Sequence, residues 1–95
     1  MFLVVEIAIM RNPPRRERGV NMQECKIRLG WEEVSEFVQK ASKCDFDIDI
    51  FYNRFVIDAK SILGVLGLDF NQVLTVRYGG QNTDFNMMLK RLAVG

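Results

Sequence analysis

The sequence contains no histidine, and this absence limits its chemistry more than any other feature. Without an imidazole, the chain has no side chain whose ordinary pKa suits proton transfer near neutral pH, and no histidine ligand for a metal. The two cysteines, Cys25 and Cys44, are far apart, so no CxxC metal or redox motif is present. These absences predict two free thiols in a reducing compartment, no metal or other cofactor, and no enzymatic activity.

Long hydrophobic runs are also absent. No apolar stretch reaches the roughly 18 residues of a membrane helix, so we expect no membrane span. The net charge is +1, but it is unevenly spread: residues 1–21 hold four arginines and two glutamates, and residues 22–95 hold nine basic and ten acidic residues. A nearly neutral domain has no electrostatic attraction for phosphate backbones, so we expect no nucleic-acid partner.

The first 21 residues differ in composition from the rest. An apolar run interrupted by Glu6 is followed by a stretch rich in arginine and proline, which does not favour a packed core. No basic residue precedes the apolar run, as one would in a secretion signal. We therefore predict a disordered extension over 1–21, with a weak tether to a membrane surface or an acidic partner as the alternative, and a single domain over 22–95.

After residue 22, the apolar pattern changes period several times. Alternation predicts four strands, and a 3.6-residue period predicts three helices between and after them. The predicted strands cover 23–29, 46–52, 55–59 and 73–78. The first helix, 31–43, carries an apolar stripe on Trp31, Val34, Phe37, Val38 and Ala41. The predicted order is βαββαβα, which is an α+β fold with one sheet face covered by helices.

Two further predicted helices have residues at their ends that are typical of helix caps. Ser61 is a suitable N-cap for a short helix over 62–66, and Gly67 is a suitable end for it. The last helix is capped by Asn82, Thr83 or Asp84, and its stripe is Phe85, Met88, Leu89 and Leu92.

Three aspartates, Asp45, Asp47 and Asp49, resemble the start of a calcium-binding loop. Such a loop needs glycine at its sixth position and glutamate at its twelfth, where this chain has Ile50 and Val56. The aspartates are better explained as the solvated face of a strand.

Three pieces of the sequence resemble the HPr family, the phosphocarriers of the bacterial sugar phosphotransferase system. Residues 38–43, VQKASK, resemble the end of the family's first helix, and Tyr52-Asn53 resembles its hairpin turn. The strongest piece is 58–66, DAKSILGVL, which is similar to the family's Lys-Ser-Ile-Met-Gly-Val-Met signature. The resemblance covers residues 22–94 and requires no gap between the three pieces.

This resemblance implies an HPr-like open-faced β-sandwich. The family has a four-stranded antiparallel sheet in the order 1-4-2-3, with three helices on one face. It also implies a cytoplasmic role in phosphoenolpyruvate-dependent sugar transport, with protein partners such as HPr kinase, a transcription regulator or phosphotransferase components.

The family's phosphate-accepting site is missing from this chain. Its histidine, and the arginine and proline close to it, fall on Gly30, Glu32 and Glu33. Glycine supplies no nucleophile, and carboxylates repel a phosphoryl group. We therefore expect no catalytic residue and a regulatory or partner-binding module in place of a phosphocarrier.

The resemblance also implies a second family site. Ser61 matches the serine that a dedicated kinase phosphorylates, and Ile62, Leu63 and Leu66 match the apolar patch that docks partners. The alternative is that Ser61 only caps a helix and that the three aliphatic side chains belong to the core.

A ferredoxin-like domain that binds a small molecule or forms a dimer is the rival interpretation. Its strand order would be 4-1-3-2, with Gly30 and Gly79-Gly80 lining a ligand cleft or a dimer seam. Strand order therefore separates the two interpretations.

Overall fold

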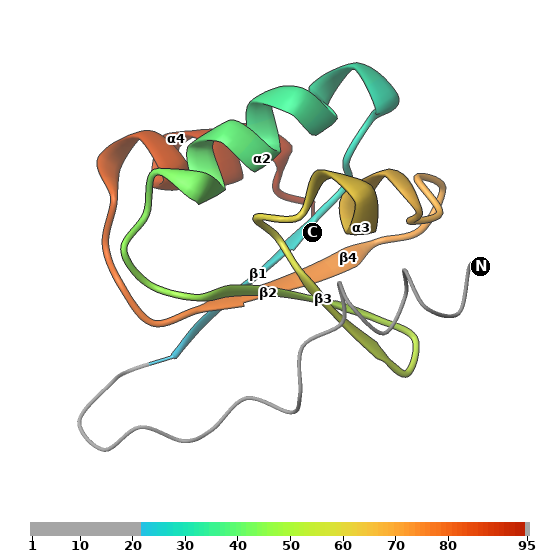
Figure 1. The fold of residues 1–95 in the computed structure, drawn as a ribbon, viewed down its shortest axis with the longest axis horizontal. Coiled ribbons are helices and arrows are strands. Elements are labelled where there is room, and N and C mark those ends of the chain that lie inside the picture. The colour runs from blue at the N-terminus through green and yellow to red at the C-terminus, as the bar shows by residue number, and fades with distance from the viewer. Residues whose placement is uncertain (1–21, 95) are drawn as a thin grey trace.

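The computed structural model in Figure 1 describes residues 22–94, so the predicted extension over 1–21 lies outside the described residues. The elements follow the predicted order, with a 3-10 turn at the start of the first helix. They are β1 (Gln23–Ile27), η1 (Trp31–Glu33), α2 (Val34–Ser42), β2 (Ile48–Tyr52), β3 (Phe55–Asp58), α3 (Ile62–Leu66), β4 (Leu74–Tyr78) and α4 (Thr83–Leu92).

The four strands form one antiparallel sheet in the order β1-β4-β2-β3. This is the order predicted for an HPr-like sheet, and it excludes the order 4-1-3-2 of the ferredoxin-like interpretation. The first and last strands in the chain, β1 and β4, are therefore neighbours in the sheet. Hydrogen bonds between distant parts of the sequence join the strands into a single sheet.

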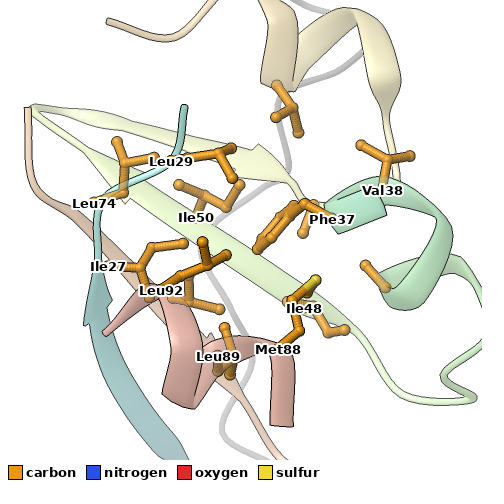
Figure 2. Packing of buried hydrophobic residues seen from close by; sticks show 14 of the residues in the cluster. Ile27, Leu29, Phe37, Val38, Ile48, Ile50, Leu74, Met88, Leu89 and Leu92 are labelled. Carbon is orange, nitrogen blue, oxygen red and sulfur yellow. The ribbon is translucent and has the colours of Figure 1, made fainter. Parts of the chain in front are cut away.

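The three helices lie on one face of the sheet, as the fold predicted (Figure 1). Their apolar stripes and the inward side chains of the strands form a single core, part of which Figure 2 shows. The whole predicted stripe of α4 is buried in this core. The largest fully buried side chains are Phe37, Phe85, Ile27, Leu29, Ile48, Ile50, Leu74, Val34, Val65 and Val76.

Two turns depend on particular residues. Asn53, in the turn between β2 and β3, has a φ of 53°, a left-handed conformation that asparagine adopts more readily than most residues. Gly80 follows β4 against the ring of Phe46, which stacks on Tyr78. A Cβ on residue 80 would lie 2.2 Å from Phe46 Cδ1, so only glycine fits there without a shift of the ring.

The other face of the sheet carries the alternate residues of each strand. The prediction that Asp49 lies on the sheet face away from the helices is correct. In the strand register, Asp49 lies opposite Arg77 of β4 and Asp58 of β3. The prediction is wrong in depth, because the Asp49 side chain is only 2% exposed. Alternation indicates the face on which a side chain lies, and it does not indicate how deeply the side chain is covered.

Candidate docking site

Ser61 caps the short helix α3 as predicted. Its backbone is extended, and its Oγ accepts a hydrogen bond from the backbone N–H of Gly64 at 3.3 Å. The Ser61 carbonyl accepts from the N–H of Val65 at 3.0 Å. The cap therefore satisfies donors in the first turn that have no partner within the helix.

The side chains of α3 divide into an inward and an outward set. Gly64 and Val65 are buried against the core. Ile62, Leu63 and Leu66 are 43%, 61% and 36% exposed, and we call these three residues the α3 patch. Their exposure excludes the alternative in which all three belong to the core.

The segment before α3 is fixed to the rest of the domain by Lys60 and Ala59. Lys60 Nζ donates to the carbonyl of Cys44, just after α2, at 2.8 Å, and its backbone N–H donates to Asp58 Oδ1 at 2.9 Å. Ala59 is fully buried, and its N–H donates to the carbonyl of Ile48 at 3.0 Å. The helix that carries the α3 patch is therefore already ordered in the free protein. Binding of a partner should then cost little conformational entropy at this site.

The entrance of the first helix holds Gly30, where the resemblance expects a histidine. The Gly30 N–H donates to Glu33 Oε1 at 2.8 Å, and the N–H of Glu33 donates to the carbonyl of Gly30 at 3.0 Å. A Cβ on residue 30 would lie 3.0 Å from Glu33 Oε1 and 3.8 Å from Glu32 Oε2. Two carboxylates thus border the place where the family carries its phosphate-accepting side chain.

Trp31 differs from its predicted position. The 3.6-residue period places it in the apolar stripe of the first helix, but it is 65% exposed. The stripe is buried from Val34 onward, because the first turn extends past the core. The indole contacts Phe70 edge to face, with ring centroids 6.2 Å apart. The exposed Trp31 therefore packs on Phe70, which is itself partly buried against the core, and the periodicity did not indicate this aromatic pair.

The thiols do not replace the missing histidine. Cys44 is buried, and its Sγ donates to the carbonyl of Lys40; Cys25 is half-buried on β1. Burial raises the pKa of both thiols, which disfavours the nucleophilic thiolate. Within residues 22–94, no group of three acidic or cysteine side chains is placed to hold a metal ion, and no helix is long and apolar enough to cross a membrane.

Ser61 provides a first prediction on stability. Replacement of a capping serine by alanine leaves the Gly64 N–H without its partner, so Ser61→Ala should lower the free energy of unfolding by about 1 kcal/mol. Ser61→Asp should retain most of the stability, because aspartate is a comparable N-cap. Denaturant unfolding of the three proteins measures this, and equal losses in the two variants would contradict the capping role.

Comparisons of the chain with protein-family models, with curated proteins and with solved structures give no match. The resemblance to HPr therefore rests on the residues quoted above, and the strand order agrees with the sheet that this resemblance implies.

Proposed function

We propose that this chain is a non-catalytic, HPr-like module that binds a protein partner through the α3 patch and acts in the cytoplasmic control of sugar transport. The observation that carries the proposal is the exposure of Ile62, Leu63 and Leu66 on a serine-capped helix in a sheet of order β1-β4-β2-β3. The local sequence of this helix is the part that most resembles the HPr family.

The α3 patch has the character of a protein-binding surface. Single exposed aliphatic residues are common, but here three of the five residues of α3 are exposed and aliphatic, and the spacings 62/66 and 63/66 are those of neighbouring side chains on a helix surface. Complete burial of one such side chain contributes about 1.5–3 kcal/mol, so a partner that covers the patch gains substantial binding energy. The partners that this proposal implies are HPr kinase, a transcription regulator or components of the phosphotransferase system.

Two features argue against a phosphocarrier. No residue of the sequence has an imidazole, and the helix entrance at Gly30 is bordered by Glu32 and Glu33. A carboxylate about 4 Å from a phosphoryl charge costs about 1 kcal/mol in water and about 4 kcal/mol at an effective dielectric constant near 20. The entrance therefore repels the group that a phosphocarrier must attract.

Ser61 is the proposed point of regulation. Phosphorylation there would add about two negative charges directly beside the α3 patch. Because charge next to an apolar surface changes which partners can cover it, phosphorylation would switch partner choice without any phosphate transfer to a sugar.

The absence of phosphate transfer is a second prediction. Incubation with radiolabelled phosphoenolpyruvate and the first enzyme of the phosphotransferase system should leave this chain unlabelled, whereas an HPr with its histidine in a parallel reaction becomes labelled. Label on this chain that is stable in base and lost in mild acid would contradict the proposal, since that behaviour identifies a nitrogen-linked phosphate.

A further inference from the structure

Trp31 is an exposed tryptophan on an ordered support. Its side chain is 65% exposed, although tryptophan is a largely buried residue type on average. The indole packs on Phe70, which lies in a turn closed by Asp69. The N–H of Asn71 donates to Asp69 Oδ1 at 3.0 Å, and the N–H of Gln72 donates to the Asp69 carbonyl at 3.1 Å. An aromatic side chain that is exposed and yet supported is typical of protein interfaces, where tryptophan is enriched.

The Trp31–Phe70 pair lies close to α3. Phe70 follows Leu66, the last residue of the α3 patch, by four residues, so their Cα atoms are at most about 14 Å apart. Figure 1 shows the start of the first helix and the loop after α3 at the same end of the molecule. A standard interface covers about 800 Å² on each partner, which is a circle about 32 Å across. One partner can therefore cover the α3 patch and Trp31 together.

The segments that carry these side chains are acidic. Residues 29–35 include two glutamates, residues 61–76 include one aspartate, and neither segment contains lysine or arginine. The basic residues next to the two segments are directed elsewhere. Arg28 alternates with two buried residues and so belongs to the sheet face away from the helices, and Lys60 donates to the carbonyl of Cys44. A surface of this charge favours a basic partner over an acidic one.

The two glutamates lie beside the residue that precedes Trp31. A Cβ on Gly30 would lie 3.8 Å from Glu32 Oε2 and 3.0 Å from Glu33 Oε1. Glu33 is engaged by the N–H of Gly30, whereas the exposed Glu32 has no hydrogen bond or ion pair with another residue of 22–94. A carboxylate available to a partner is therefore next to the exposed indole.

We propose that the partner that covers the α3 patch places an arginine side chain on the indole of Trp31, next to the carboxylates of Glu32 and Glu33. Tryptophan is the aromatic residue that attracts a cation most strongly, and a guanidinium can stack on its face while it donates to a carboxylate. This inference names the chemistry of the partner at a second contact, so it rests on the proposed function.

Two synthetic peptides test the inference. One is acetyl-Ala-Leu-Arg-Leu-Leu-Ala-amide, and the other has glutamine in place of the arginine. Millimolar arginine peptide added to the isotope-labelled full chain should shift the indole N–H resonance of Trp31, which is a single signal because the chain has one tryptophan. The glutamine peptide should bind about tenfold more weakly, because it keeps the apolar contacts and loses the cation–π contact and the ion pair.

Three variants of the chain identify the contacts. Glu32→Gln should weaken the arginine peptide by about threefold and leave the glutamine peptide unchanged. Asp84→Asn is the matched control, because Asp84 is an exposed carboxylate in the first turn of a different helix, and it should change neither affinity. Leu63→Ala should weaken both peptides by the same factor, so the preference for arginine should remain.

Three results would overturn the inference. They are a Trp31 resonance that the arginine peptide leaves in place, equal affinity of the two peptides, and equal effects of Glu32→Gln and Asp84→Asn. A Trp31 resonance that moves when the chain alone is diluted would also overturn it, since that would assign the surface to a second copy of the chain. Failure of the proposed function gives a different result, in which Leu63→Ala changes the affinity of neither peptide.

Discussion

The proposed docking through the α3 patch predicts that Leu63→Asp weakens the binding of HPr kinase by about 30-fold, because Leu63 is the most exposed member of the patch and a carboxylate there must be desolvated in the complex. Loss of a central apolar contact in an interface costs about 2 kcal/mol or more, and each 1.4 kcal/mol is tenfold in affinity. Isothermal titration calorimetry measures the effect.

Met87→Asp is the matched control for this variant. Met87 of α4 is 64% exposed, close to the 61% of Leu63, and the substitution introduces the same charge on a different helix. It should leave the affinity unchanged. Equal weakening by the two variants would indicate a general charge effect, and unchanged binding of Leu63→Asp would exclude the α3 patch as the docking surface. Both variants should retain the wild-type unfolding midpoint, because neither side chain belongs to the core.

Met88→Ala is expected to lower the free energy of unfolding by about 2–5 kcal/mol, a large part of the stability of a small domain. The Met88 side chain is 2% exposed and belongs to the core cluster that α4 covers, part of which Figure 2 shows. Its removal loses the transfer free energy of the side chain and leaves a cavity that the surrounding structure fills only in part.

Met87→Ala removes the same atoms from the neighbouring position of the same helix. Because Met87 is exposed, this change should alter the free energy of unfolding by about 0.5 kcal/mol or less. Urea unfolding of the two variants measures the difference in their free energies of unfolding. The slope of that free energy against urea concentration should be the same in both variants. Similar losses in both variants would mean that the face of α4 toward the core is assigned incorrectly.

The structure matches the sequence-based expectations most closely where the signals are local. α3 has the predicted bounds because a capping serine and a following glycine mark both of its ends. The last helix had three candidate caps, and only Asn82 accepts a hydrogen bond from the N–H of Phe85. Local hydrogen bonding sets such boundaries, so sequence alone narrows them to a few residues.

The sequence-based expectations were wrong about how deeply two side chains are buried. Trp31 continues the apolar stripe of the first helix, yet it lies beyond the edge of the core and is exposed. Asp49 alternates with inward residues, yet it is covered. A period specifies the direction of a side chain relative to its own element, whereas burial depends on what the rest of the chain places against that direction.

The candidate site shows the same limit. Ile62, Leu63 and Leu66 are equally compatible with a core helix and with a docking surface when only their apolar character is known. The packing of Gly64 and Val65 against the core decides between the two, because it turns the other three side chains outward. That orientation depends on contacts with α2 and β3, which lie outside the helix.

The most direct measurement is the change in backbone amide resonances of the isotope-labelled full chain when unlabelled HPr kinase is added. The proposed docking surface requires the largest changes at Ser61 to Gly67, around the α3 patch. Changes confined to Gly30 and Gly79-Gly80, or to the outward residues of the sheet, would contradict it, as would a spectrum that the kinase leaves unaltered.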